Sequence, residues 1–384
     1  MDMAEWIEKR MEDIADFNPR ESLIKGSVAK KIAMDKLQPF CRDIPNFEIE
    51  SFFGGTKFRN NDTIMARITP CLENGKTAKV NILEEDEIGF GSTEFMVFRA
   101  KEETDPDFLY YLIISPIIRE PAIKSMVGSS GRQRVQTDVV QKLMVRVPDL
   151  NTQRAIAGIL KSLDDKIAEN RKINNNLEQQ AQAIYQQMFI DNPTPDWIEG
   201  SLSDIANITM GQSPSGSSYN EDRIGAIFFQ GRAEFGFRFP TIRLYTNEPK
   251  RMAYANDILM SVRAPVGDLN VAHNDCCIGR GLAAIHSKTN HQSFVLYTMF
   301  SLKKQLDVFN GEGTVFGSIN RNSLNDMPIL IPADEQIEKF ELIVAPMDAA
   351  IRNNYDEICC LQAVRDSLLP RLMSGELDVS NIDI

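Results

Sequence analysis

Glycine-bearing segments are the first places to look for chemistry, because glycine loops can hold phosphate groups. Residues 73–77 read ENGKT and have the Gly-Lys-Thr ending of a phosphate-binding loop. That loop also needs a glycine five residues before Gly75, where this chain has Pro70, and the residues that follow read as a strand. The triplets GFG at 89–91 and GRG at 279–281 lack the third glycine of a dinucleotide loop. We therefore expect no nucleotide site and interpret both triplets as structural bends that let two backbones approach closely.

Side chains that could act as acids, bases or metal ligands have no partners at a suitable spacing. His273, His286 and His291 have no spaced carboxylates or cysteines beside them, and the six cysteines form no CxxC pair. Asp164 and Asp165 are predicted to form a solvated helix face. No two prolines are adjacent, so the Pro-Pro tetrapeptide with which adenine methyltransferases hold a flipped base is missing. The sequence predicts neither a catalytic centre nor a metal site.

Four polar, cationic and glycine-bearing segments remain, in corresponding places of the two halves of the chain. Arginine, lysine, asparagine and glutamine reach base edges and phosphates, and glycine lets a loop approach DNA. These segments predict a nucleic-acid interface, although ordinary surface loops share their composition. They are GTKFRNND at 55–62, GSSGRQRVQ at 128–136, QGRAEFGFRFPTIRLY at 230–245 and GEGTVFGSINR at 311–321.

The formal net charge of −12 argues at first against a nucleic-acid partner, because DNA-binding proteins usually carry a basic footprint. The charge is unevenly distributed, however. Residues 333–384 hold 4 basic and 11 acidic side chains, whereas residues 200–332 hold 12 basic and 11 acidic ones. A nearly neutral domain can still bind DNA where its arginines gather on one face.

Length and composition favour a globular protein of two or three domains, because 384 residues exceed one ordinary domain. No stretch offers the roughly 18 apolar residues that span a bilayer. The first residues, MDMAEWIEKRMEDIADF, lack the apolar core of a secretory signal. We expect a cytoplasmic location and no membrane partner.

The chain repeats itself in four blocks that recur in the same order. Four matches in one order indicate duplication of a whole domain rather than a solenoid. The matched blocks are EWIEKRMEDIAD from Glu5 with DWIEGSLSDIAN from Asp196, NDTIMARITP from Asn61 with NDILMSVRAP from Asn256, IGFG at Ile88 with IGRG at Ile278, and VQTDVVQKLMVRVP ending at Pro148 with INRNSLNDMPILIP ending at Pro332.

Each repeat is followed by a long polar segment whose apolar residues alternate at steps of four and three, as in a coiled-coil seam. A narrow apolar stripe is typical of a two-helix rod, and the alternative is that each helix lies on its own domain as an ordinary amphipathic helix. The predicted seam consists of Ile156, Leu160, Leu163, Ile167, Asn170, Leu177, Ile184 and Met188 in the first helix, and of Phe340, Val344, Met347, Ile351, Asn354, Ile358, Leu361, Leu368 and Leu372 in the second.

Short connections and two similar globular units favour an antiparallel pairing of these helices. Ile156 would then lie near Leu372, and Met188 near Phe340. The two halves would be related by a pseudo-two-fold axis. A buried pair of Asn170 and Asn354 near the middle would fix the register of the helices.

The predicted fold class is mixed α/β (α+β), with two similar globular domains of twisted, irregular sheets and two long helices that form an antiparallel coiled coil. The expected strands include TIMARI, FMVFRA, AIFFQG and DILMSVR, and the expected domain helices are PDFLYYLIIS and SFVLYTMFSLKKQL. Two prolines in DNPTPD end the first long helix. The predicted boundaries are 1–150 for the first domain, 151–190 for its helix, 191–196 for a linker, 197–332 for the second domain, 333–374 for its helix and 375–384 for a tail.

With these motifs in this order, the chain resembles the specificity subunit of type I restriction-modification systems over nearly its whole length. Proline followed by a glutamine-bearing helix start recurs at Pro148 and Gln153 and at Pro332 and Gln336. The other matching motifs are ARITPCLENGKTA at 66–78, GSTEF at 91–95, GSSGRQRV at 128–135 and GSINRNSLNDMPILIP at 317–332.

The resemblance implies a subunit without catalytic activity and without a cofactor of its own. Each target-recognition domain would read one half of a bipartite, asymmetric target in double-stranded DNA. The helices would recruit two methyltransferase subunits, which carry S-adenosylmethionine and modify adenine, and restriction/translocase subunits would join for cleavage. The helix pair would set the half-site separation near one DNA turn, about 34 Å.

The chain is short between Phe17 and Lys57, where the family's recognition loops are expected to vary. Two other functions stay open, namely a coiled-coil scaffold or decoy without specific DNA binding and a stand-alone DNA-modifying enzyme. The predicted DNA contacts are Lys57, Arg59, Lys76, Arg132, Gln133 and Arg134 in the first domain, and Tyr219, Arg232, Arg238, Arg243, Arg263, Asn320 and Arg321 in the second.

Overall fold

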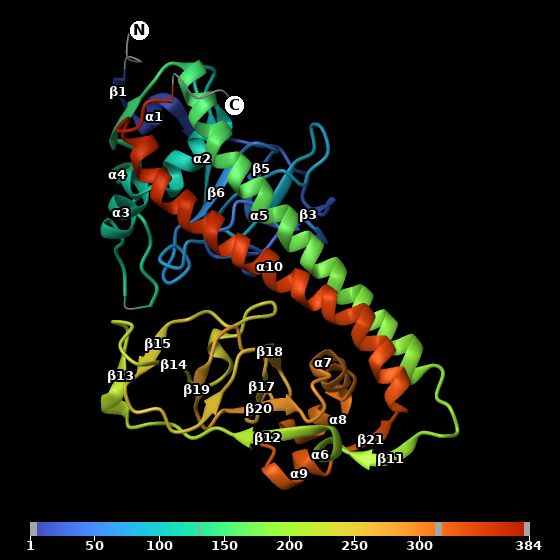
Figure 1. The fold of residues 1–384 in the computed structure, drawn as a ribbon. Coiled ribbons are helices and arrows are strands. Elements are labelled where there is room, and N and C mark those ends of the chain that lie inside the picture. The colour runs from blue at the N-terminus through green and yellow to red at the C-terminus, as the bar shows by residue number, and fades with distance from the viewer. Residues whose placement is uncertain (1–5, 130, 312–316, 380–384) are drawn as a thin grey trace. The chain divides into compact units, whose positions relative to one another are not determined.

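The computed structural model describes residues 6–129, 131–311 and 317–379 (Figure 1). Ser130, residues 312–316 of the predicted segment 311–321 and the last five residues of the predicted tail lie outside the described residues. The chain divides into two compact units, which are Met1–Lys172 with Asn354–Ile384, and Ile173–Asn353. We call these unit 1 and unit 2. Each contains one globular repeat and a part of both long helices.

Unit 1 is built on small sheets covered by helices. Strand β1 (Ile7–Arg10) pairs with β10 (Met144–Val147), and a second sheet has the order β2 (Ala15–Phe17), β9 (Phe95–Ala100), β6 (Thr63–Ala66) and β7 (Thr77–Lys79). A third has the order β4 (Glu48–Ser51), β3 (Val28–Ile32), β8 (Gly89–Gly91) and β5 (Thr56–Phe58), in which β3 and β8 are parallel. The helices are α1 (Met11–Ile14), α2 (Pro106–Ile114), α3 (Pro116–Lys124), α4 (Thr137–Gln141) and the 3-10 turn Met34–Lys36.

Unit 2 repeats this plan. Strand β11 (Ile198–Ser201) pairs with β21 (Pro328–Ile331), and the next sheet has the order β12 (Ala206–Met210), β20 (Leu282–Ser287), β17 (Ile258–Ser261) and β18 (Leu269–Val271). The third runs β13 (Tyr219–Asn220), β15 (Leu244–Thr246), β14 (Ala226–Phe229), β19 (Cys276–Ile278) and β16 (Met252–Ala253), with β14 and β19 parallel. The helices are α6 (Leu202–Ile205), α7 (Gln292–Ser301), α8 (Lys303–Asp307), α9 (Arg321–Asn325) and the 3-10 turns Gly216–Ser218, Arg232–Glu234 and Val308–Asn310.

The duplication extends to single residues. Asn61 and Asn256 both adopt positive φ, 71° and 75°, and each backbone amide donates a hydrogen bond of 2.8 Å, to Val80 and Ala272 respectively. One of the predicted matches is wrong. The sequence blocks place Gly91 with Gly281, but β8 and β19 are the equivalent parallel-paired strands, and each ends four positions before the next strand begins. Gly91 therefore corresponds to Ile278, because GFG forms a strand whereas GRG follows one.

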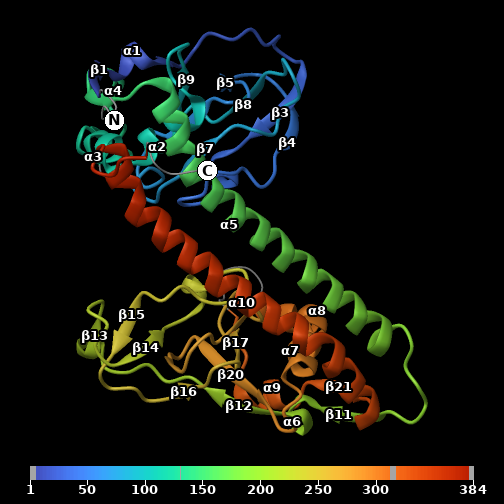
Figure 2. The same cartoon turned by 45° about the horizontal axis from the view of Figure 1, so that its top comes forward.

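The long helices are α5 (Leu150–Tyr185), which continues into the π-helical turn Gln186–Ile190, and α10 (Asp334–Met373). In each unit their segments lie side by side and run in opposite directions (Figure 1 and Figure 2). Ile156 and Leu372 share the core of unit 1, as predicted. None of the helices among the described residues is long and apolar enough to cross a membrane.

At several positions of α5, the buried residue is the one after the residue predicted for the seam. Leu163, Ile184 and Met188 are half-buried, whereas Tyr185 and Phe189 are buried. The Phe189 ring lies 5.3 Å from the ring of Phe340, in the place predicted for Met188. A straight helix drifts against a strict seven-residue repeat, which accounts for the shift. The buried residues of the predicted seam are Ile156, Leu160, Ile167, Asn170, Phe340, Val344, Ile351, Ile358 and Leu372, and the half-buried ones also include Leu177, Met347, Asn354, Leu361 and Leu368.

Polar side chains occupy the middle of the helix pair. Asn170 is 1% exposed and donates a hydrogen bond of 2.8 Å to the Glu357 carboxylate, one turn beyond Asn354 on α10. Asn174 is also buried and donates to the backbone carbonyl of Ile351 at 3.2 Å. A buried amide must be hydrogen-bonded, so these contacts favour one register of the helices.

Candidate nucleic-acid interface

In unit 1 the predicted residues Arg132, Gln133 and Arg134 lie along one edge, beside the chain that leaves β6. The Thr69 amide donates to the Gln133 carbonyl at 3.0 Å, and the Val135 amide donates to the Arg67 carbonyl at 2.9 Å. Arg132 is exposed, Gln133 is half-buried, and the Arg134 side chain is 48% exposed. This ladder fixes the backbone of three polar residues at a solvent-exposed edge.

The Arg134 side chain makes a bidentate ion pair with Glu94. Its Nε lies 3.0 and 2.9 Å from the two carboxylate oxygens, and its Nη2 lies 2.6 Å from Oε1. The hydrogen bond with Arg134 lowers the pKa of Glu94, and the same bond raises that of Arg134. Both groups therefore stay charged at neutral pH.

Unit 2 builds the same edge from equivalent residues. The Ala264 amide donates to the Gly317 carbonyl at 3.0 Å, and the Ile319 amide donates to the Val262 carbonyl at 3.1 Å, so that Arg263 is bridged to Ser318. The predicted residues Arg263, Asn320 and Arg321 are all exposed. The Asn320 side chain also caps α9 by accepting the Ser323 amide at 2.9 Å.

Arg280 belongs to this edge and was missed from the sequence. It is exposed, and its neighbour Gly281 accepts the Val262 amide at 3.0 Å. The signal was the GRG triplet, which we interpreted only as a bend. GFG forms strand β8, so the prediction of a bend there is wrong. The predicted bend is present in GRG, where a Cβ at Gly279 or Gly281 would lie within 2.9 Å of the Gln230 backbone. That close approach brings the predicted residue Arg232 near the edge, where it pairs with Asp268 at 2.8 Å.

Three predicted residues of unit 1 make contacts within the domain instead. Lys57 donates to the Glu21 carbonyl, and Arg59 pairs with the Glu21 carboxylate at 2.7 Å. Burial alone would raise the pKa of Glu21, but hydrogen bonds from Arg59 and Arg99 outweigh it and lower this pKa. Lys76 donates to the Met34 carbonyl at 2.9 Å.

Two predicted residues of unit 2 are also engaged locally. Arg243 pairs with Glu234 at 2.8 Å while remaining exposed. The Tyr219 hydroxyl donates to the Pro214 carbonyl at 3.1 Å, and its ring lies 4.7 Å from that of Phe228. Neither contact places the side chain on the edge formed by Arg263 and Ser318.

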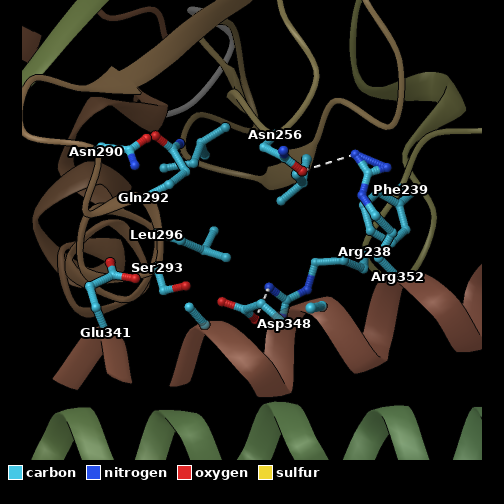
Figure 3. Close-up of a pocket in the computed structure, with 14 residues that line it drawn as sticks. Arg238, Phe239, Asn256, Asn290, Gln292, Ser293, Leu296, Glu341, Asp348 and Arg352 are labelled. Carbon is cyan, nitrogen blue, oxygen red and sulfur yellow. Dashed lines mark hydrogen bonds and ion pairs between the residues drawn. The ribbon is translucent and has the colours of Figure 1, made fainter. Parts of the chain in front are cut away.

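The structure contradicts the prediction for Arg238. This side chain is buried and pairs with Glu178 at 2.9 Å and with Asp348 at 3.0 Å, so the two long helices hold it. It lines a cavity of about 320 Å³, which Glu341 and Arg352 also line (Figure 3). A guanidinium that compensates two buried carboxylates is not available to DNA.

The prediction that Asp164 lies on a solvated helix face is also wrong, because this side chain is buried. Its carboxylate accepts the Tyr111 hydroxyl at 2.8 Å and pairs with Arg365 at 2.7 Å. Sequence reasoning missed this role, since the partners lie 53 and 201 positions away. Among the described residues, no cluster of three or more His, Cys, Asp or Glu side chains could hold a metal ion.

Comparison with known proteins identifies the architecture. Residues 3–179 and 195–354 match the family model of the type I restriction modification DNA specificity domain. These two ranges cover both repeats, most of α5 and about half of α10. The chain belongs to the type I restriction-modification specificity family. As a member of this family, it serves in sequence-specific DNA recognition.

Relatives within the specificity family support this assignment. A putative type I restriction enzyme MjaX specificity subunit of Methanocaldococcus jannaschii is 31% identical over 73% of this chain and 70% of its own length. The type I restriction enzyme HindI specificity subunit of Haemophilus influenzae is 24% identical over 74% of this chain and 81% of its own length. A crystal structure of a type I S subunit from M. genitalium is 15% identical, covers 96% of both chains and has a TM-score of 0.55, so it shares the fold.

Proposed function

We propose that the chain reads a bipartite, asymmetric DNA target, with one globular repeat for each half-site. The observation that carries this proposal is the exposed edge that both repeats build from equivalent backbone bonds. The edges carry different side chains, with Arg134 bridged to Ile68 in unit 1 and Arg263 bridged to Ser318 in unit 2. Equivalent edges with different side chains suit a target whose two halves differ in sequence.

The proposed contacts are the residues that the structure leaves accessible at the two edges. They are Arg132, Gln133 and Arg134 in the first repeat and Arg232, Arg263, Arg280, Asn320 and Arg321 in the second. Lys57, Arg59, Lys76, Tyr219 and Arg243 remain untested predictions, because their local partners would have to be exchanged for DNA. Arg238 is excluded from the proposed DNA contacts, because its side chain is buried.

We further propose that the outer faces of α5 and α10 recruit two methyltransferase subunits. Leu342 is 79% exposed, and Ile343, Val364 and Ile173 are also exposed on these helices. A contiguous exposed apolar patch marks an interaction surface, and the adjacent Leu342 and Ile343 are the residues that we propose for it. The methyltransferase subunits would supply S-adenosylmethionine and the reaction at adenine, restriction/translocase subunits would join for cleavage, and this chain would contribute no catalytic group.

The decisive experiment compares methylated adenines in host DNA with and without the gene for this chain. Loss of methylation at one split, asymmetric motif is expected. If the methylation pattern stays unchanged, and the chain with methyltransferase subunits retards all duplexes equally in gel shifts, the proposal is wrong and a scaffold without specific DNA binding is supported. Methyl transfer by the purified chain alone would instead indicate an enzyme.

A further inference from the structure

The Glu94–Arg134 pair leaves one end of the guanidinium unoccupied by the carboxylate. Glu94 engages the edge formed by Nε and Nη2, so Nη1 and the outer hydrogen of Nη2 remain as donors at the tip. The Arg134 side chain is 48% exposed, whereas Glu94 is 23% exposed. Two parallel donors at the tip match the O6 and N7 acceptors of guanine in the major groove.

The backbone on both sides of this pair is fixed. Arg134 exchanges two hydrogen bonds with Val127, at 2.9 and 3.0 Å. The Glu94 carbonyl accepts the Arg67 amide at 2.9 Å, and the Glu94 amide donates to the Ser92 hydroxyl at 3.1 Å. Because the backbone is fixed and Glu94 pairs with the Arg134 side chain, much of the conformational entropy of this side chain is already lost in the free protein.

The negative charge of Glu94 also affects which DNA group is favoured. A carboxylate beside the arginine repels a phosphate and weakens a purely electrostatic contact. It does not prevent contact with the uncharged edge of a base. We propose that Glu94 is a positioning residue that presents Arg134 for bidentate reading of a guanine in the half-site of the first repeat. This inference rests on the proposed function.

The second repeat provides an internal contrast. Gly281 stands at the position of Glu94. The Glu94 carbonyl accepts the amide of the residue after β6, and the Gly281 carbonyl accepts the amide of the residue after β17. Ser318 stands at the position of Arg134, and Arg263 at that of Ile68. Within the described part of the chain, Arg263 makes no ion pair with a carboxylate. We expect Arg263 to contact phosphate, so it serves as the control for an arginine without a positioning carboxylate.

The test uses the full chain assembled with its methyltransferase subunits and a library of duplexes randomised at each position. The selected sequences and the dependence of affinity on salt are measured for the unaltered chain and for E94Q, R134K, R134A and R263A. The unaltered complex should select guanine at one position of the first half-site. Both R134A and R134K should lower that preference at least about fivefold, because lysine lacks the planar fork.

E94Q should lower the same preference several-fold while total DNA affinity is kept or increased. The slope of log affinity against log salt should steepen by about one, because the released arginine can contact phosphate. R263A should weaken binding to all duplexes alike and make the slope shallower by about one.

Unchanged selectivity of E94Q at every position would overturn the positioning role, whatever happened to total affinity. Circular dichroism melting verifies that each variant folds. If E94Q does not fold, R134K still tests base reading. Failure of the unaltered complex to select any sequence would instead reject the proposed function, so the two failures are distinguishable.

Discussion

Tyr297 donates its hydroxyl hydrogen bond to Asp348 at 3.0 Å, and the pair Tyr111 and Asp164 makes the same bond in the other repeat at 2.8 Å. Each bond joins a domain helix to a long helix. The cation that compensates the carboxylate differs, because unit 2 uses Arg238 from a loop and unit 1 uses Arg365 from α10. Both repeats therefore have an aspartate at this place, but the arginine that pairs with it comes from a different part of the chain in each repeat.

Removing Asp164 should destabilise unit 1 strongly. Asp164→Ala leaves the buried Arg365 guanidinium without its main partner, and breaking a buried ion pair costs about 3–5 kcal/mol. Urea unfolding followed by circular dichroism measures this loss. Glu169→Gln on the same helix is the control, because that side chain is 64% exposed and should change stability by less than about 1 kcal/mol. Similar effects of both substitutions would contradict the role of Asp164.

Replacing Arg238 should separate stability from DNA reading. Arg238→Ala leaves Glu178 and Asp348 without their cation, so we expect a loss of about 3–5 kcal/mol in the unfolding free energy. Where the variant still folds at low temperature, the base preferences of the assembled complex should be unchanged. A relaxed base preference with normal stability would restore Arg238 as a DNA contact.

Arg280→Ala should weaken DNA binding without destabilising the fold, because the side chain is exposed. We expect lower affinity at low salt, and a salt slope shallower by about one if the contact is to phosphate. Filter binding at several salt concentrations gives both quantities. Arg371→Ala, an exposed arginine near the end of α10, is the matched control for the loss of one positive charge. Equal effects of the two substitutions would remove Arg280 from the interface.

Two carboxyl groups should give opposite pH dependences of stability. Arg59 and Arg99 lower the pKa of Glu21 below its ordinary 4.5 against the effect of burial, so its stabilising contribution is present above pH 4.5 and is lost as the pH falls through the folded value. Burial raises the pKa of Glu341, so this group lowers stability as the pH rises above 4.5.

Glu21→Gln should therefore destabilise the protein at pH 7, and Glu341→Gln should stabilise it. The amide introduced by Glu341→Gln would keep an oxygen to accept the Phe294 backbone amide, which Glu341 accepts at 2.7 Å. Thermal melting between pH 4 and pH 8 compares the variants. Melting curves that shift in the same direction for both substitutions at pH 7 would contradict this account.

Periodic and repeated features of the fold could be predicted from the sequence, because local spacing encodes them. The long helices follow their apolar repeat, and Asn61 and Asn256 mark the same turn in both halves. Asp164 and Arg238 could not be predicted, since their partners come from distant segments and a charged residue is usually exposed. Arg263 and Arg321 were proposed as DNA contacts from composition and are exposed in the structure, whereas the pairing of Arg134 with Glu94 depends on a contact between segments 40 positions apart.

The division of the two helices between the units has a consequence for synthesis. Unit 2 is one continuous stretch, Ile173–Asn353, whereas unit 1 needs Asn354 onward to complete the core that holds Leu369, Leu372 and Val379. On the ribosome, the second half of the protein can therefore mature first. The first half must wait, with part of its apolar interior uncovered, until the end of α10 emerges.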